Sequence, residues 1–238
     1  MTEDRYTRHR PLLSEEGWER LCGARILIAG VGGLGSHVLG SLGRLAPLVL
    51  ELWDPGVTDE PDLNRQVLYG PQDLGRNKVE TAAERLCTQN PELKITAFAE
   101  ALTVERFAET RSAADAPEVD VVFDCLDSFS ARAGLADIQL RYELPVFHAG
   151  VEGWYGQAST FLSAAYSYEQ VFGKGFREIP PAGKPIFAHV VAVLAATQVS
   201  EFLSWCEDPG RTPLSHTLLL YDGRSSTIDK IALDNSEQ

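Results

Sequence analysis

A glycine-rich segment near the N-terminus has the spacing of a phosphate-binding turn. The sequence GVGGLG directly follows a short apolar run, and its glycines are Gly30, Gly32, Gly33 and Gly35. Glycines there let the backbone approach a phosphate, and the next helix would offer unpaired N–H groups and positive potential at its N-terminus. Asp54 lies 24 residues after Gly30 and ends the next apolar run, where a carboxylate can accept hydrogen bonds from ribose hydroxyls. Together these residues predict a nucleotide site, although a glycine turn alone is also typical of close packing between a strand and a helix.

Further charged residues favour ATP over a dinucleotide. Arg65 and Lys78 are cations beyond the second predicted strand that could converge on a polyphosphate. Gln66, which adjoins Arg65, is also expected to contact the nucleotide. Asp127 follows the fourth predicted strand, at the edge of a parallel sheet where ligands bind, and its carboxylate could hold Mg²⁺. Singly, these residues also fit a surface ion pair, a solvated helix residue and a helix cap. The segments that carry them are DLNRQ (residues 62–66), GRNKVE (75–80) and DCLDS (124–128).

The elements that must position these residues alternate along the chain. This alternation predicts an α/β fold with a Rossmann-like, mainly parallel sheet and crossover helices, extended by antiparallel C-terminal strands. We expect strands at residues 24–30, 48–54, 94–98, 119–124, 145–148, 157–162, 218–222 and 227–233, and helices at residues 36–46, 77–89 and 128–142.

The expected organisation is an N-terminal helical arm (residues 1–23) followed by one domain (24–238). Within that domain the nucleotide-binding core spans about 24–150, and a second part spans about 151–238. Residues 166–185 carry three glycines and three prolines without a clear period, so we expect a long surface loop there.

Charge and apolar patterning exclude several classes of protein. The net charge is −13, with 21 basic and 34 acidic residues, which argues against broad nucleic-acid binding because that affinity comes from neutralising phosphates. Residues 186–205 are apolar enough to suggest a membrane span, but His189, Gln198 and Glu201 interrupt them. We expect a buried core or subunit-interface helix there, and no membrane partner.

The cysteine pattern predicts free thiols. Cys22, Cys87, Cys125 and Cys206 are far apart, and no pair has the spacing of a zinc or redox motif. The N-terminus is charged and lacks the apolar segment of a secretory signal. Both features favour a reducing, cytoplasmic location.

The order of the motifs resembles that of the ubiquitin-activating-enzyme-like adenylyltransferases, the ThiF/MoeB/HesA family. In pattern the chain is most similar to the molybdopterin-synthase and the thiazole-pathway sulfur-carrier adenylyltransferases. The resemblance is strong to about residue 162 and weaker beyond it. It rests on RYTRH (residues 5–9), GVGGLGS (30–36), WDPGV (53–57) and the three segments named above.

The resemblance implies a role for each matching residue. It implies that Asp54 holds the ribose, that Arg65 and Lys78 contact phosphates, and that Asp127 serves Mg²⁺. It also implies that Arg8 reaches into the partner subunit's site, which makes a homodimer. The implied reaction is attack of a protein's C-terminal carboxylate on the α-phosphate of ATP. No general base is needed, because the carboxylate is already ionised and catalysis rests on positioning and charge neutralisation.

The chain departs from the family pattern in its cysteines. It lacks the paired CxxC motifs that bind zinc, so we expect a zinc-less member. No cysteine lies between residues 156 and 185, so we expect adenylation without a catalytic-cysteine thioester. Cys125 and Cys206 are expected to be core thiols.

Other departures concern single residues. Asp62 stands where relatives often have asparagine, and we expect it to face away from the phosphates or to bind metal. Ser128 replaces an asparagine after Asp127. His148 is expected to be a satisfied histidine at the end of a strand. The loop cations, which could clamp a carrier tail or simply be solvated, are Lys174, Arg177 and Lys184.

The leading hypothesis is adenylation of the C-terminal Gly-Gly of a small ubiquitin-like sulfur-carrier protein, with ATP and Mg²⁺. The same chemistry fits a small-molecule carboxylate in cofactor biosynthesis or a carboxylate on a modified tRNA base, although the net charge weighs against tRNA. A catalytically silent ATP- or carrier-binding scaffold is a further alternative. An NAD-dependent dehydrogenase would leave Arg65, Lys78 and Asp127 without a role.

Overall fold

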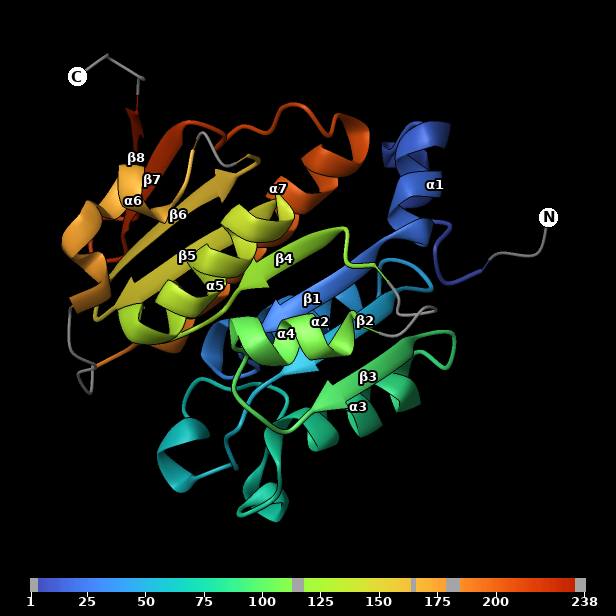
Figure 1. The fold of residues 1–238 in the computed structure, drawn as a ribbon. Helices are drawn as coiled ribbons and strands as arrows, with labels where there is room; N and C mark the ends of the chain where they lie inside the picture. The colour runs from blue at the N-terminus through green and yellow to red at the C-terminus, as the bar shows by residue number, and fades with distance from the viewer. Residues whose placement is uncertain (1–3, 113–117, 164–165, 179–184, 234–238) are drawn as a thin grey trace.

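An eight-stranded mixed sheet forms the centre of the molecule (Figure 1). The computed structural model describes residues 4–112, 118–163, 166–178 and 185–233. The strand order is β3-β2-β1-β4-β5-β6-β7-β8; β1 to β5 run parallel and β6 to β8 are antiparallel, which confirms the predicted fold class. The strands are β1 (Arg25–Ala29), β2 (Val49–Trp53), β3 (Lys94–Phe98), β4 (Val121–Asp124), β5 (Val146–Glu152), β6 (Tyr155–Phe161), β7 (Thr217–Asp222) and β8 (Thr227–Ala232).

Helices cover both faces of the sheet. In Figure 1, α4 and α5 lie in front of the strands, and α2, α3 and α7 lie behind them. Each layer closes its own apolar core against the sheet. The helices are α1 (Glu15–Gly23), α2 (Gly33–Leu42), α3 (Lys78–Gln89), α4 (Val104–Thr110), α5 (Phe129–Tyr142), α6 (Tyr168–Phe172) and α7 (Ala188–Glu207), with 3-10 turns η1 (Arg10–Leu12), η2 (Glu60–Asp62), η3 (Pro71–Asp73) and η4 (Lys174–Glu178).

The strand order reverses between β1 and β4. From β1 the chain moves outward to β2 and β3, then returns to place β4 on the other side of β1. The two crossovers therefore leave in opposite directions from the carboxyl ends of β1 and β4. Ligands of open α/β sheets bind at this kind of switch point. The glycine turn begins at the carboxyl end of β1.

The long apolar helix α7 is a core helix. Among the described helices it alone is long and apolar enough to span a membrane by length and composition. It packs against α1, α2, β5 and β6, and Val190, Leu194 and Phe202 on it are fully buried. The Phe202 ring lies 5.6 Å from Phe123 and 5.9 Å from Phe147, measured between centroids. The prediction of a buried helix is confirmed.

The prediction of a long surface loop at residues 166–185 is wrong for the residues that the structure describes. Tyr168 begins α6, and η4 follows it. The aromatic rings of Tyr168 and Phe176 are fully buried and stack 6.0 Å apart, while Phe172 packs edge-on against Phe129 at 5.4 Å. Burial of these rings stabilises local structure that the glycines and prolines obscure in the sequence. Lys184 lies outside the described residues.

Other boundaries also differ from expectation. α2 begins at Gly33, three residues before the predicted start, and α4 was not predicted. β5 continues to Glu152 because it pairs with β6 over its whole length. The N-terminal helix α1 is tied to α7, since the backbone N–H and the hydroxyl of Ser14 both donate to Glu207 at 2.8 Å.

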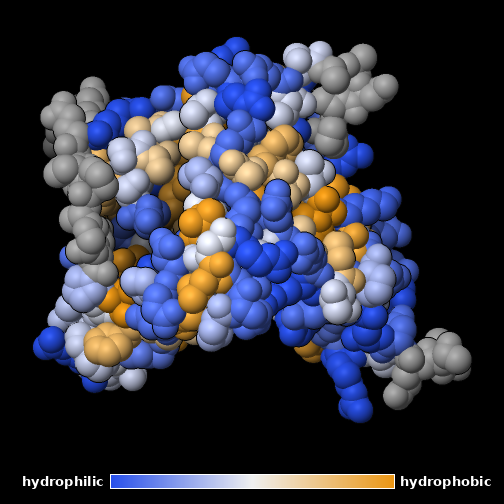
Figure 2. All heavy atoms as spheres, turned by 90° about the horizontal axis from the view of Figure 1, so that it is seen from below, coloured by the Kyte–Doolittle hydropathy of each residue, from blue (hydrophilic) through white to orange (hydrophobic). Residues whose placement is uncertain are grey.

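The segment between β2 and α3 extends below the sheet in Figure 1. Figure 2, which views the molecule from that side, shows small groups of apolar side chains on a mostly polar face. The exposed apolar residues of this segment are Val57, Val67 and Leu74. The same segment carries Arg65 and leads into Lys78, so it places both cations beside the carboxyl edge of the sheet.

Candidate nucleotide-binding site

Two glycines of the turn are required by the fold itself. Gly30 has φ of +89°, a conformation that favours glycine, and a Cβ there would stand 2.8 Å from the carbonyl oxygen of Cys125. A Cβ on Gly35 would collide with the carbonyl oxygen of Gly30. The end of β1 can therefore press against the end of β4, and α2 can begin close to β1, only because both residues lack side chains.

The other two glycines are not explained by packing. A Cβ on Gly32 would stand 3.6 Å from Gln66, and one on Gly33 would stand 3.5 Å from Val191, both ordinary contacts. Gly32 caps α2 without a side-chain hydrogen bond, so the first-turn N–H groups have no side-chain acceptor among the described residues. Open amides at a helix N-terminus fit an anionic ligand, and a bare backbone lets a phosphate approach them.

Asp54 links the glycine turn to the segment that follows β2. Its Oδ2 accepts from the Val31 amide at 2.8 Å, and its Oδ1 accepts from the Gly56 amide at 2.7 Å. The side chain is half-buried, and each carboxylate oxygen retains capacity for a further hydrogen bond. This placement fits the predicted contact with ribose hydroxyls.

The structure brings Arg65 and Lys78 to the same edge as the glycine turn. The Arg65 methylenes pass over Gly33, 3.7 Å from its Cβ position. Lys78 is the first residue of α3, and its Nζ lies 3.5 Å from the Cβ position of Gly56, beside Asp54. Two cations, one carboxylate and an open helix N-terminus thus share one edge of the sheet.

Asp62 faces these cations and does not face away from them, while the alternative expectation, that it binds metal, stays a prediction. Its Oδ2 lies 2.9 Å from Lys78 Nζ, and its Oδ1 lies 3.4 Å from Arg65 Nη2. Gln66 Nε2 donates to Oδ1 at 2.6 Å, while Gln66 Oε1 is buried without a partner among the described residues. Asp62 is 9% exposed, and a carboxylate that buried needs opposite charges and donors around it.

Asp127 lies in the exposed turn between β4 and α5. Its carboxylate makes no hydrogen bond or ion pair with the described residues. Ser128 caps α5 instead, since its hydroxyl accepts from the Ala131 amide at 3.3 Å. Asp127 is therefore not needed as a helix cap, and it is free to meet a cation at the carboxyl end of β4.

The structure does not bring Arg8 to the other predicted site residues. Arg8 is exposed and has no partner among the described residues. Next to it, His9 Nε2 lies 2.7 Å from the carbonyl oxygen of Leu45, beyond the C-terminal end of α2. The glycine turn is at the other end of this 10-residue helix, about 15 Å away at about 1.5 Å per residue. Arg8 therefore lies near the opposite end of α2 from the site in its own chain.

A buried cluster surrounds Asp124 and was not predicted from the sequence. The Asp124 carboxylate accepts from Arg132 Nε at 2.9 Å, Tyr168 Oη at 2.9 Å and the Leu126 amide at 3.0 Å. His148 Nδ1 lies 2.6 Å from the same carboxylate, within β5 rather than at its end. His148 Nε2 is buried without a partner among the described residues, so the expectation of a satisfied histidine holds for one nitrogen only.

This cluster positions the turn that carries Asp127. The Leu126 amide donates to Asp124, and Arg132 Nη2 donates to the Leu126 carbonyl oxygen, so both sides of that residue are held. Arg132 also donates to the carbonyl oxygen of Ala149 at 2.9 Å and ties the turn to β5. In the sequence, only the first aspartate of DCLDS points to this cluster. The other members could not be found from it, because they lie up to 44 residues away in the chain.

Charge in the cluster follows from burial and pairing. Burial raises the pKa of Asp124, but Arg132, His148 and the Leu126 amide together lower it more, to about 2. Burial lowers the pKa of His148, and the bond to Asp124 offsets this only in part. His148 is therefore a neutral imidazole that donates to the carboxylate, and Arg132 is the countercharge of Asp124.

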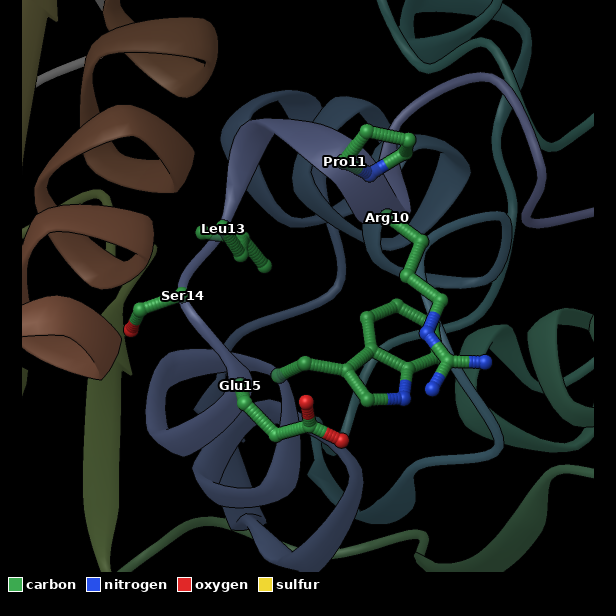
Figure 3. A pocket seen from close by; sticks show the side chains of 6 residues that line it. Arg10, Pro11, Leu13, Ser14 and Glu15 are labelled. Atoms are coloured by element: carbon green, nitrogen blue, oxygen red, sulfur yellow. The ribbon is translucent and has the colours of Figure 1, made fainter.

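A separate hollow lies at the N-terminal segment (Figure 3). It has a volume of about 230 Å³ and lies between η1 and α1, where the Arg10 guanidinium stands 5.4 Å from the centre of the Trp18 ring. None of its lining residues belongs to the predicted site. The hollow therefore does not mark the nucleotide site.

The described residues contain no preformed cluster of metal-binding side chains. Within those residues, no three His, Cys, Asp or Glu side chains lie together as a metal site. All four cysteines are free; Cys125 and Cys206 are buried, as predicted. Burial raises the pKa of Cys125 and raises that of Cys206 to about 12.

The fold and the switch-point turn define a nucleotide-binding α/β protein of the Rossmann-like type. The sequence profile of the ThiF family matches residues 6–238, and the chain belongs to this family. The family membership inferred from the motifs is therefore confirmed.

Relatives and solved structures cover nearly the whole chain. It is 28% identical to the probable adenylyltransferase/sulfurtransferase MoeZ of Mycobacterium tuberculosis over 96% of its length, and it spans 59% of that protein. It is 27% identical to the sulfur carrier protein ThiS adenylyltransferase of Escherichia coli, covering 96% of this chain and 90% of the relative. The E. coli MccB structure with AMPCPP and MccA superimposes with a TM-score of 0.80 at 21% identity, over 99% of this chain and 73% of MccB.

Two glycine substitutions separate the structural role of the turn from the binding role. We expect Gly35→Ala to lower the free energy of unfolding by about 1–3 kcal/mol, because the methyl group collides with the Gly30 carbonyl. Gly33→Ala fits sterically, so we expect a change within about 1 kcal/mol but ATP binding about tenfold weaker. Urea unfolding and titration calorimetry measure the two effects. Wild-type ATP affinity in Gly33→Ala would contradict this assignment.

Buried His148 predicts a pH dependence of stability. Its pKa is lowered in the folded protein, whereas the unfolded chain protonates it near pH 6.5. The unfolded state therefore binds more protons just below that pH, and stability falls as the pH drops below about 7. We expect His148→Gln to flatten this slope in urea unfolding series. Equal slopes in wild type and His148→Gln would refute the neutral imidazole.

Proposed function

We propose that this chain is an ATP-dependent adenylyltransferase that activates the C-terminal Gly-Gly carboxylate of a small ubiquitin-like sulfur-carrier protein. The observation that carries the proposal is the meeting of Arg65, Lys78 and Asp54 with the open N-terminus of α2. The name of the E. coli relative, a ThiS adenylyltransferase, supports the choice of substrate.

In this reaction the chain has to position the two reactants and neutralise phosphate charge, and it does not have to transfer protons. A carboxylate oxygen of the carrier attacks the α-phosphorus of ATP, the bond from that phosphorus to the bridging oxygen of the β-phosphate breaks, and pyrophosphate leaves. Arg65, Lys78 and the amides of Gly33 and Leu34 would neutralise the charge that develops on phosphate oxygens. Asp54 would fix the ribose. In-line positioning then supplies much of the rate enhancement.

A magnesium ion fits the carboxylates at this edge. Asp127 is exposed and unpaired among the described residues, and carboxylate and phosphate oxygens are the ligands that Mg²⁺ prefers. Bound there, Mg²⁺ would neutralise phosphate charge.

We propose that no cysteine takes over the activated carrier. Cys125 and Cys206 are buried thiols with a raised pKa. Cys87 is exposed on α3, but it lies nine residues after Lys78, about 13 Å along the helix at about 1.5 Å per residue. The free thiols also fit a reducing compartment, and we propose a cytoplasmic location.

We further propose a homodimer in which Arg8 completes the partner's site. Arg8 lies near the opposite end of α2 from the glycine turn in its own chain, so it cannot reach the phosphates there. An exposed arginine without a partner among the described residues is available to a second copy. A closed two-fold dimer would supply one Arg8 to each site.

Carrier-dependent ATP–pyrophosphate exchange tests the proposed activity. We expect exchange in the presence of a carrier ending in Gly-Gly, and at least about a hundredfold less in Lys78→Ala, because a cation on the phosphates is lost. Lys94→Ala is the matched control. Lys94 is the first residue of β3, so it lies at the amino ends of the parallel strands and not at the carboxyl ends, where the site is. Exchange supported only by a small carboxylic acid would redirect the proposal to that substrate.

The same exchange assay tests whether a cysteine is required. Together with binding measurements, it also distinguishes the enzyme from a silent scaffold and from a dehydrogenase. A variant with all four cysteines replaced is expected to exchange as the wild type does; loss of exchange in this variant, still folded, would require a cysteine adduct. Binding of ATP and carrier without exchange would indicate a silent scaffold. Tight NAD binding with no ATP binding would indicate a dehydrogenase.

Mixing two inactive variants tests the role of Arg8. We expect Arg8→Ala and Lys78→Ala each to lose exchange, and a mixture of the two to regain part of it, because mixed dimers contain one intact site. Arg10→Ala, two residues away in the same exposed segment, is expected to retain activity and serves as control. A mixture no more active than its components would contradict a role in the partner's site.

A further inference from the structure

The carboxylate of Asp62 occupies the place between the two cations that are proposed to bind phosphate. It is bonded to Lys78 Nζ at 2.9 Å and to Arg65 Nη2 at 3.4 Å. Gln66 Nε2 and the Asp59 amide also donate to it, at 2.6 and 3.2 Å. The side chains of Asp62 and Lys78 are each 13% exposed, so water and salt screen this pair less than a surface pair.

These contacts fix the positions of both cations. Asp62 ends the short turn η2, and three of its four donors come from the neighbouring residues 59–66. Lys78 comes from a different element, the start of α3, and is drawn to the same carboxylate. The phosphate-binding side chains are thus pre-organised, but their charge is already partnered.

The site consequently carries no excess of positive charge. Two cations, Arg65 and Lys78, stand against the carboxylates of Asp54 and Asp62, and the exposed carboxylate of Asp127 lies at the same edge of the sheet. A free triphosphate is strongly anionic and gains little from such a site, within a chain whose net charge is −13. Its magnesium complex is less anionic and brings a cation that carboxylates bind well.

We infer that Asp62 is a specificity-determining residue that makes nucleotide binding depend on Mg²⁺; this inference rests on the proposed nucleotide site. Phosphate oxygens have to displace the Asp62 carboxylate from Lys78 and Arg65. The displaced carboxylate is then a negative charge beside the phosphates, and the two repel each other. A divalent cation removes this penalty, because it neutralises the phosphates and can pair with the carboxylate. The site therefore admits the magnesium complex and disfavours free ATP.

Asp62→Asn tests the inference, because asparagine keeps the shape and one acceptor oxygen while it removes the charge. In EDTA, which removes Mg²⁺, we expect the variant to bind ATP at least about tenfold more tightly than wild type. The reason is that Lys78 and Arg65 in the variant no longer pair with the Asp62 carboxylate. In excess Mg²⁺ we expect the two proteins to differ by less than about threefold. Titration calorimetry of the full chain with ATP measures both conditions.

Glu60→Gln is the matched control. Glu60 is exposed on the same turn, makes no ion pair with the described residues, and undergoes the same change of charge. We expect it to leave the ratio of affinities with and without Mg²⁺ unchanged. Asp62→Ser provides a second neutral side chain if Asp62→Asn does not fold, and circular dichroism monitors folding of each variant.

The outcomes separate this inference from the proposed function. Wild type that binds ATP with Mg²⁺, together with Asp62→Asn that gains nothing in EDTA, overturns the role of Asp62 alone. An equal gain in Glu60→Gln also overturns it, since the effect is then general electrostatics. Wild type that binds no ATP even with Mg²⁺ overturns the proposed function and the inference together.

Discussion

The close approach of Gly30 to the end of β4 is the constraint on which the site depends. The left-handed backbone of Gly30, packed against the Cys125 carbonyl oxygen, lets the chain leave β1 and enter α2 within three residues. This places the open N-terminus of α2 at the point where the strand order reverses. The segment after β2 then lies over the turn, with the Arg65 methylenes against Gly33. Any larger residue at position 30 would separate β1 from β4 and move these groups apart.

The cations at and beneath this edge of the sheet form ion pairs with carboxylates. A chain with net charge −13 requires a local exception to bind phosphate, and a bare basic patch is the simplest form of that exception. The structure instead shows cations held by carboxylates: Arg132 by Asp124 in the interior, and Lys78 with Arg65 by Asp62 at the edge. Pairing keeps buried charges in place and fixes side-chain geometry before a ligand arrives. It also means that a ligand must compete for the cations.

Local patterns in the sequence predicted the strands and the glycine turn, because these depend on neighbours in the chain. The order of the motifs along a parallel sheet predicted that Asp54, Arg65 and Lys78 gather near the turn. Long-range contacts escaped prediction. The partners of Asp124 come from α5, β5 and α6, and no periodic pattern links them. The sequence shows that position 62 carries a negative charge. It does not show which way the Asp62 side chain points, because its partner Lys78 comes from another element. The helix α6 was not predicted because glycines and prolines lie close to it in the sequence. Its first residue, Tyr168, is buried and donates a hydrogen bond to Asp124.

The position of a bound nucleotide can be seen in a crystal structure of this chain with Mg²⁺ and a non-hydrolysable ATP analogue. We expect phosphate oxygens within hydrogen-bond distance of Lys78, Arg65 and the first amides of α2, the ribose at Asp54, and Arg8 of the partner subunit beside the phosphates. A nucleotide bound elsewhere on the molecule would refute the proposed site. Phosphates in the glycine turn that touch neither Lys78 nor Arg65 would refute it as well.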